Sequence, residues 1–179
     1  MARKRDLAEG LFHVTCHSVW GLPLFRDDID RIEYVAELER TKNVYGWTCV
    51  SVVLLTTHVH TILEVQDGTL AEGMQRLNFL HAVRFNSRHH RRGHVFGARY
   101  DSRRLKDDSY LLTAYKYDVW NPVEAGLAAK PEDWRWSSYA AAIGLRDDFA
   151  FVDPSRVLGC FGGTPEIAVA RLKAFVDDR

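Results

Sequence analysis

The sequence predicts an α+β fold of the ferredoxin-like, split βαβ type, with an antiparallel sheet, helices on one of its faces and helical additions at the C-terminus. Segments with strand-like and helix-like apolar spacing follow one another in the order β-α-β-β-α-β-α. Two adjacent strands between two helices are the signature of the split βαβ arrangement. A chain of 179 residues, of which 46% are hydrophobic and 27% charged, can bury a core of this kind.

Four segments have the composition of β-strands or extended chain. The first three are rich in β-branched residues, and only Thr56 and Thr57 separate the second from the third, as in a hairpin. The fourth is less regular and is expected as an extended segment or a strand. In chain order these segments are residues 12–19, 47–55, 58–65 and 94–105.

The helices are marked by capping residues and by apolar residues three or four positions apart. Asp27 and Asp107 stand where helices are expected to start, and Tyr45-Gly46 where one is expected to stop. Asn121-Pro122 is expected to end the third helix, because the residue before a proline avoids the helical conformation. The second helix follows a turn at Asp67-Gly68-Thr69. The helices are expected at residues 29–44, 70–90, 110–120, 131–144 and 164–176.

Composition also excludes several classes of protein. No run of 18 apolar residues is present, and the basic start Met1–Asp6 is not followed by the apolar region of a signal peptide. Cys16, Cys49 and Cys160 are too few and too scattered for a disulfide framework or a cysteine zinc site. We therefore expect a cytoplasmic protein with no membrane partner. Residues 1–146 are expected to form the main domain, and residues 147–179 a helical tail.

The net charge of zero conceals a strongly basic segment. Residues 84–106 contain eight basic residues and one acidic residue, Asp101, which gives the segment a net charge of +7. Such an asymmetry favours contact with a polyanion, although a solvated helix end and loop would have the same composition. The arginines that we expect to contact phosphates are Arg84, Arg88, Arg91, Arg92, Arg99, Arg103 and Arg104.

His58 and His60 are candidate metal ligands. They lie two residues apart on an expected strand, so both imidazoles point to the same face of the sheet. Two neutral imidazoles held in parallel form half of a site for a divalent cation. The alternative is that they are ordinary surface histidines.

Tyr117 and Asn121 are the second candidate pair. They lie four residues apart on an expected helix and therefore on one of its faces. A tyrosine hydroxyl becomes a useful nucleophile toward a phosphodiester when a metal ion neutralises charge, and an amide oxygen one turn away can complete the metal shell. Tyr115 falls in register with Leu111 and Val119 and is expected in the core. Phe96 and Tyr100 lie among the arginines and are expected either to stack on bases or, more simply, to fill the core.

Several motifs together resemble those of a known family. The chain is similar to the REP-associated tyrosine transposases, a branch of the IS200/IS605-like (Y1) transposases within the HUH single-strand nuclease superfamily. The resemblance covers roughly residues 10–144. It rests on Phe12-His13-Val14-Thr15, Pro23-Leu24-Phe25-Arg26-Asp27, His58-Val59-His60, Gly73-Met74-Gln75-Arg76-Leu77-Asn78, Gly93-His94-Val95-Phe96, Asn121-Pro122-Val123, Ala125-Gly126-Leu127 and Pro131-Glu132-Asp133-Trp134-Arg135-Trp136-Ser137-Ser138-Tyr139.

The resemblance implies an HUH fold in which His58, His60 and Asn121 bind Mg²⁺ or Mn²⁺ and Tyr117 is the nucleophile. In such enzymes the tyrosine attacks a phosphodiester of single-stranded DNA and leaves a 5′-phosphotyrosine link and a free 3′-hydroxyl. The substrates of the family are imperfect hairpins in repeated extragenic palindromes. The protein would act as a monomer or a homodimer.

Two other functions remain open. The chain departs from the family pattern at Asp118, whose negative charge would lie near the nucleophile and hinder its approach to phosphate. A diverged module that binds hairpins without cutting them is therefore the alternative to the enzyme. A small metallohydrolase with a water nucleophile at His58 and His60 is the third candidate.

Overall fold

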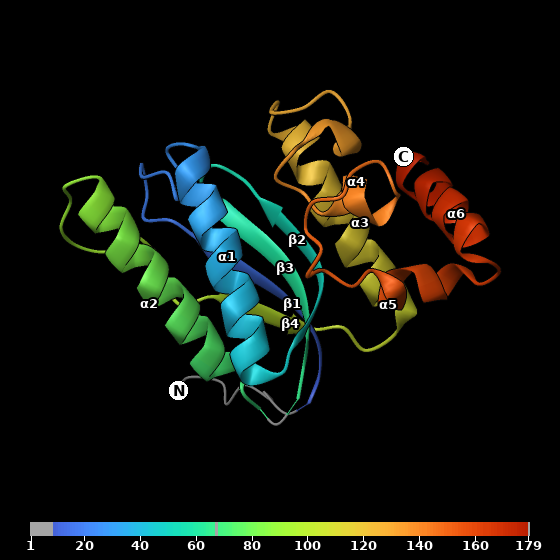
Figure 1. Ribbon diagram of the computed structural model, residues 1–179, viewed down its shortest axis with the longest axis horizontal. Helices are drawn as coiled ribbons and strands as arrows, with labels where there is room; N and C mark the ends of the chain where they lie inside the picture. The colour runs from blue at the N-terminus through green and yellow to red at the C-terminus, as the bar shows by residue number, and fades with distance from the viewer. Residues whose placement is uncertain (1–8, 67, 179) are drawn as a thin grey trace.

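A four-stranded sheet forms the centre of the protein (Figure 1). The computed structural model describes residues 9–66 and 68–178. Its strands are β1 (Gly10–His17), β2 (Thr48–Leu54), β3 (His58–Val65) and β4 (Asp101–Arg104). They lie in the order β2-β3-β1-β4, and every neighbouring pair is antiparallel. The predicted ferredoxin-like arrangement is confirmed, and β1 and β3 occupy its two central positions.

Helices cover both faces of this sheet (Figure 1). The first two, α1 (Asp28–Tyr45) and α2 (Leu70–Arg88), pack against one face, as predicted. The opposite face is covered by α3 and by the C-terminal additions. These elements are α3 (Asp108–Glu124), η1 (Pro131–Asp133), α4 (Tyr139–Ala142), α5 (Ser155–Leu158), η2 (Gly159–Phe161) and α6 (Pro165–Asp177).

The central strands send alternate side chains into two separate cores. On β1, Phe12 and Val14 belong to the cluster under α1 and α2, while Leu11 belongs to the cluster under α3. Side chains alternate along a strand, so His13 and Thr15 share the α3 face with Leu11. Val157 and Leu172 of the C-terminal tail are buried in that same cluster. The α3 face is therefore the face that any site built on β1, β3 and α3 would use.

The helix starts follow the capping residues of the sequence. Asp27 accepts a hydrogen bond from the backbone N–H of Asp30, and Asp107 accepts one from that of Tyr110. Gly46 closes α1 in the left-handed conformation, with φ of 65°. The expected turn before α2 includes Asp67, which lies outside the described residues, as does the basic start of the chain.

The prediction that Asn121-Pro122 ends the third helix is wrong. Helix α3 continues through Pro122 to Glu124. A proline in the last turn removes only its own N–H donor, and the helix stops where Gly126 takes a positive φ of 71°. Gly126 donates to the carbonyl of Val123 and Leu127 to that of Pro122, which completes a Schellman stop. Asn121 therefore lies within the helix, on the same face as Tyr117.

The single helix expected at residues 131–144 is also wrong. The chain forms η1, then a turn with a single bridge from Ser137 to β2, then α4. In this turn the carbonyl of Trp136 accepts from Leu54, and the N–H of Ser138 donates to Val52, at 2.8 and 2.9 Å. Pairing with β2 competes with helix formation here, because the edge of β2 otherwise leaves its backbone groups unpaired. The fourth expected strand is shorter than 94–105, since only Asp101–Arg104 pairs with β1 over consecutive residues.

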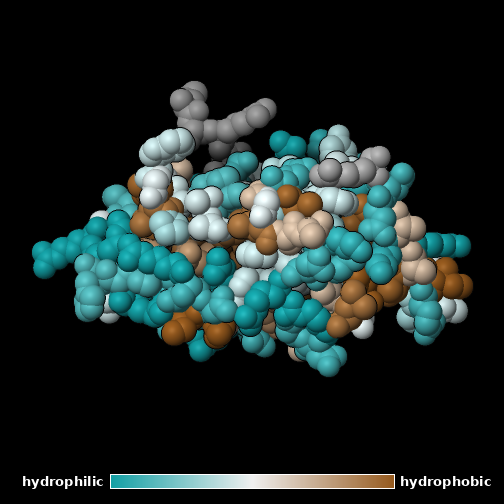
Figure 2. All heavy atoms as spheres, turned by 90° about the horizontal axis from the view of Figure 1, so that it is seen from above, coloured by the Kyte–Doolittle hydropathy of each residue, from teal (hydrophilic) through white to brown (hydrophobic). Residues whose placement is uncertain are grey.

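The outer surface is largely hydrophilic. Figure 2 shows small groups of apolar side chains among polar and charged ones on the face seen from above. Among the helices of the described residues, none is both long and apolar enough to cross a membrane.

Candidate active site

The two central strands bring four histidines together on the α3 face. In the antiparallel register His17 lies opposite His58, and Thr15 lies opposite His60. The rings of His17 and His58 stack with their centroids 5.0 Å apart, and those of His13 and His60 stack at 5.4 Å. The rings of His58 and His60 are 5.0 Å apart. The predicted pair is thus half of a larger cluster.

The sequence prediction missed His13 and His17 as site residues. They lie four residues apart on β1 and therefore point to the same face of the strand. Their spacing alone does not identify them as site residues. They join the site because the pairing of β1 with β3 places them beside His58 and His60.

Helix α3 brings the candidate nucleophile to this cluster. The ring centroid of Tyr117 lies 5.6 Å from that of His60 and 6.5 Å from that of His13, edge-on in both cases. Its side chain is 52% exposed, so its hydroxyl can be approached from solvent. Asn121, one turn further along, donates to the carbonyl of Tyr117 at 2.9 Å, and its side chain lies near enough to His58 to oppose the lowering of that residue's pKa by burial. The structure therefore brings together Tyr117, Asn121, His58 and His60.

Asp118 lies beneath the histidines. Its carboxylate accepts a hydrogen bond from Nε2 of His13 at 2.8 Å, and the same oxygen is 3.2 Å from Nδ1 of His60. The residue is 0% exposed, and this burial raises its pKa to about 6, against the opposing effect of His13. From the sequence, this charge is expected to hinder the approach of phosphate. Instead the carboxylate is turned into the protein interior, toward the histidines.

His58 and His60 are held in the neutral form that a metal ion requires. Burial, and to a smaller extent the neighbouring histidines, lower the pKa of His60 to about 2. Burial also lowers the pKa of His58. Nε2 of His60 is buried and has no hydrogen-bond partner among the described residues. A buried lone pair without a donor fits a cation, so the residues present fit a divalent metal ion.

Two overlapping ligand sets share His60. One atom each from His13, His60 and Asp118 lie within 4.8 Å of one another and could hold a metal ion. The second set is the one implied by the sequence resemblance, in which His58, His60 and Asn121 hold the ion. Both sets lie within reach of Tyr117, which contacts the ring of His60.

Of the other aromatic residues near these motifs, Tyr115, Tyr100 and Phe96 belong to the core, whereas Tyr110 does not. Tyr115 is buried near Tyr139, as expected, and burial raises its pKa well above the usual value. Tyr110 is exposed at the start of α3, near the capping residue Asp107. Tyr100 is buried, and Phe96 is half-buried against His81, so the simpler expectation of core filling is confirmed for both.

The arginines of the basic segment do not form one continuous strip. Arg84 pairs with Glu37 of α1 at 2.9 Å, and Arg88 pairs with Asp27 and Asp30 at the start of α1. Arg91 lies over the ring of Phe85, and Arg104 donates to the carbonyl of Glu9. Arg92, Arg99 and Arg103 are exposed, and no ion pair joins them to a carboxylate of residues 9–66 or 68–178.

Arg103 is the one nearest to the histidines in the sheet register. It pairs with His13 across β1 and β4, and paired residues of antiparallel strands point to the same face. Its guanidinium therefore rises from the same face as the histidine cluster, one strand further out.

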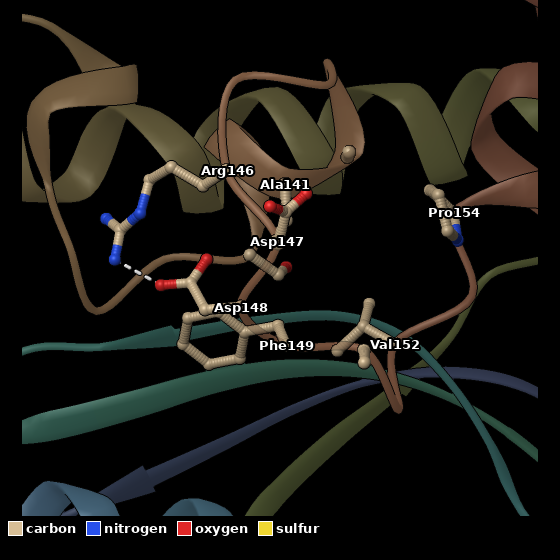
Figure 3. A pocket seen from close by; sticks show the side chains of 10 residues that line it. Ala141, Arg146, Asp147, Asp148, Phe149, Val152 and Pro154 are labelled. Carbon is tan, nitrogen blue, oxygen red and sulfur yellow. Dashed lines mark hydrogen bonds and ion pairs between the residues drawn. The ribbon is translucent and has the colours of Figure 1, made fainter.

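A pocket elsewhere in the molecule contains none of these residues. It lies beside the edge of β2, and its lining includes Ser138, Phe149 and Val152 (Figure 3). An ion pair between Arg146 and Asp148 lies at its side (Figure 3). The candidate active site is therefore the histidine surface and not this pocket.

Comparisons with known proteins agree with this geometry at the level of the fold. No protein-family model and no curated protein sequence matches the chain. A solved structure described as a REP-associated tyrosine transposase bound to a REP hairpin superposes with a TM-score of 0.69 at 14% sequence identity. The match covers 82% of this chain and 88% of that one. The resemblance seen in the sequence thus extends to the structure, and this chain has the fold of a REP-associated tyrosine transposase.

Proposed function

We propose that the protein is a metal-dependent, site-specific endonuclease and strand transferase of the transposase type, acting on hairpin DNA. The observation that carries this proposal is the position of Tyr117. An exposed phenol stands 5.6 Å, ring to ring, from a buried neutral histidine whose Nε2 has no protein donor among the described residues. A nucleophile beside a metal site is an arrangement that supports phosphodiester transfer.

His58, His60 and Asn121 would hold Mg²⁺ or Mn²⁺, which supplies charge neutralisation at the phosphodiester. Oxygen and amide ligands suit both ions, and imidazole favours Mn²⁺. Asn121 has two functions in this arrangement, since its amide N–H also ties its side chain to the backbone of α3 at Tyr117. The helix thereby fixes the nucleophile and the amide ligand to one rigid element.

The proposed reaction conserves the phosphodiester bond energy. The hydroxyl oxygen of Tyr117 bonds to phosphorus and loses its proton, while the bond from phosphorus to the 3′-oxygen breaks and that oxygen gains a proton. The products are a 5′-phosphotyrosine and a free 3′-hydroxyl. Attack by a 3′-hydroxyl reverses the step and joins strands, so the cycle needs no external energy source.

Contacts to DNA are proposed for the basic segment of residues 84–106. Arg92, Arg99 and Arg103 are exposed and supply the main phosphate contacts, because Arg84 and Arg88 are already paired with carboxylates on α1 and at its N-cap. The solved structure with this fold is described with a bound REP hairpin, which supports a hairpin as the DNA partner here. We expect action in the cytoplasm, as a monomer or a homodimer.

The test is formation of a covalent adduct. With a labelled hairpin oligonucleotide carrying a single-stranded flank, and with Mn²⁺, the protein is expected to form a denaturation-resistant protein–DNA adduct. Tyr117→Phe should abolish the adduct. Tyr110→Phe, which removes an exposed hydroxyl from the same helix, should leave it intact. An adduct that survives in Tyr117→Phe would contradict the proposal, and metal-dependent cleavage without an adduct would indicate a water nucleophile instead.

The non-cleaving hairpin-binding module remains the second candidate. It is favoured by the hydrogen bonds from His13 to Asp118 and between Thr15 and His60. These bonds give ring nitrogens of the cluster partners within the protein, so those nitrogens do not need a metal ion as a partner. This candidate predicts salt-sensitive hairpin binding that a chelator does not change, with no adduct in Mn²⁺ or Mg²⁺.

A further inference from the structure

Trp20 is the most exposed large apolar side chain of the described residues, at 99%. It sits in a tight turn in which the N–H of Leu22 donates to the carbonyl of Val19 at 3.0 Å. Gly21 occupies the third position of this turn with φ of 75°, as a type II turn requires. Trp20 is therefore the second residue of the turn, and its indole projects outward.

The backbone of the turn is fixed on both sides. The N–H of Ser18 donates to the carbonyl of Thr57, just before β3, and that of Val19 donates to the carbonyl of Val95, at 2.8 and 2.9 Å. Segment 95–97 runs so close that a Cβ on Gly97 would lie 2.9 Å from the carbonyl oxygen of Ser18. The indole is thus exposed on a rigid support, so little backbone entropy would be lost when a ligand binds to it.

The turn also continues directly from the histidine cluster. His17, three residues before Trp20, ends β1 and stacks on His58. On the other side, Arg92 and Arg99 flank the segment that Val19 bonds to, and both are exposed. The turn of Trp20 is therefore joined on one side to the strand that carries His17, and on the other, by a backbone hydrogen bond, to a segment with an exposed arginine before it and another after it.

We propose that Trp20 is a stacking platform for an unpaired base of the single-stranded DNA that flanks the scissile phosphodiester. This inference rests on the proposed function. An exposed aromatic ring among arginines is the usual support for single-stranded nucleic acid, because every base has a π-face while the cations follow the backbone. The three aromatic residues within the basic segment are not available for this role, because Phe85 and Tyr100 are buried and Phe96 is half-buried.

The experiment compares binding of two fluorescein-labelled DNA probes by the full-length protein. One is a 12-nucleotide single strand, and the other is a hairpin whose stem is fully paired and carries no unpaired flank. Trp20→Ala should weaken binding of the single strand about tenfold or more and change binding of the paired hairpin little, whereas Trp20→Phe should retain most of the affinity. Tyr110→Ala, an exposed aromatic on α3, is the matched control and should bind both probes like the wild type.

Equal binding of the single strand by Trp20→Ala and the wild type would overturn the inference. Equal losses on both probes would also overturn it, since they would indicate a general contact rather than base stacking. Because Trp20 is almost fully exposed, the substitutions should leave the thermal stability unchanged. The adduct assay keeps the two proposals separate. An adduct lost in Tyr117→Phe with normal binding by Trp20→Ala supports only the proposed function, and weakened binding without any adduct supports only the base platform.

Discussion

Asp118 contacts two histidines through one oxygen atom. It accepts from Nε2 of His13, and it is 3.2 Å from Nδ1 of His60, which also contacts the hydroxyl of Thr15. A lone pair on Nδ1 would face the carboxylate oxygen and be repelled, so the proton of neutral His60 belongs on Nδ1. This leaves the lone pair on Nε2, the atom that lacks a protein donor. A carboxylate behind a ligating histidine is a common way to orient the imidazole and raise its basicity.

Removing the charge of Asp118 should weaken metal binding. Asp118→Asn is expected to lower the affinity for Mn²⁺ by about tenfold to a hundredfold, measured by titration calorimetry, because the carboxylate no longer holds the proton of His60 on Nδ1. The control is Asp101→Asn, which removes an exposed carboxylate from β4, beside Thr15 on the same face of the sheet. It should bind Mn²⁺ like the wild type.

Either of two results would contradict this assignment. Unchanged affinity in Asp118→Asn would show that the carboxylate does not orient His60. Complete loss of binding in that variant, with binding retained in Asn121→Ala, would place the ion directly on His13, His60 and Asp118.

At the scale of the element, α3 shows how local sequence signals compete. Its start follows Asp107, as the sequence predicts, but Pro122 does not end it. A proline destabilises the helical turn before it, because it removes a backbone hydrogen bond and crowds the carbonyl four residues earlier. In α3 that turn contains Asp118 and Val119, which are buried against the sheet. Tertiary packing therefore holds the turn helical, and the glycine after it provides the stop. The spacing of Tyr117 and Asn121 on one helical face could be predicted, whereas the end of the helix could not.

The basic segment divides into arginines bound by the protein and arginines exposed to solvent. Arg103→Gln should lower the slope of log affinity against log salt for single-stranded DNA by about 0.7, because one phosphate contact and its released counterion are lost. Arg84→Gln should leave the slope unchanged, because Arg84 already pairs with buried Glu37. Fluorescence anisotropy titrations at several salt concentrations measure both slopes. Equal effects of the two substitutions would show that the pairing with α1 does not withdraw Arg84 from DNA.

At the scale of the whole molecule, the sequence predicts what depends on periodicity and misses what depends on register. The order of strands and helices follows from apolar spacing and caps, and the structure confirms it. His13 and His17 join the site only through the pairing of β1 with β3. Arg84 and Arg88 lose their availability only through the packing of α2 on α1. Neither contact is encoded within a short stretch of chain.

A buried histidine away from the candidate active site, His81, makes the free energy of unfolding depend on pH. His81 of α2 is buried, its Nε2–H donates to the carbonyl of Leu24, and burial lowers its pKa from 6.5 to about 4. The unfolded chain binds a proton below pH 6.5 that the folded protein takes up only near pH 4. This residue therefore destabilises the fold progressively as the pH falls through that window, by about 3 kcal/mol in total.

Urea unfolding of wild type and His81→Gln at pH 7 and pH 4.5 tests this expectation. Glutamine keeps a donor for Leu24 but does not titrate, so the variant should lose less stability than the wild type between the two pH values. Taking the difference between the two proteins removes the contribution of other groups, including Asp118, whose raised pKa acts in the opposite direction. A parallel loss in both proteins would rule His81 out as the source.

The stretch from Trp134 to Ser138 limits how the sheets of two copies of the molecule can join edge to edge. It bonds to Leu54 and Val52 along the free side of β2, and the indole N–H of Trp134 adds a further bond to the carbonyl of Leu54. A foreign strand therefore finds these positions already occupied. On the opposite margin β4 offers only four residues, a short template for strand addition. The chain's own covering segment thus protects the sheet against edge-to-edge growth into aggregates.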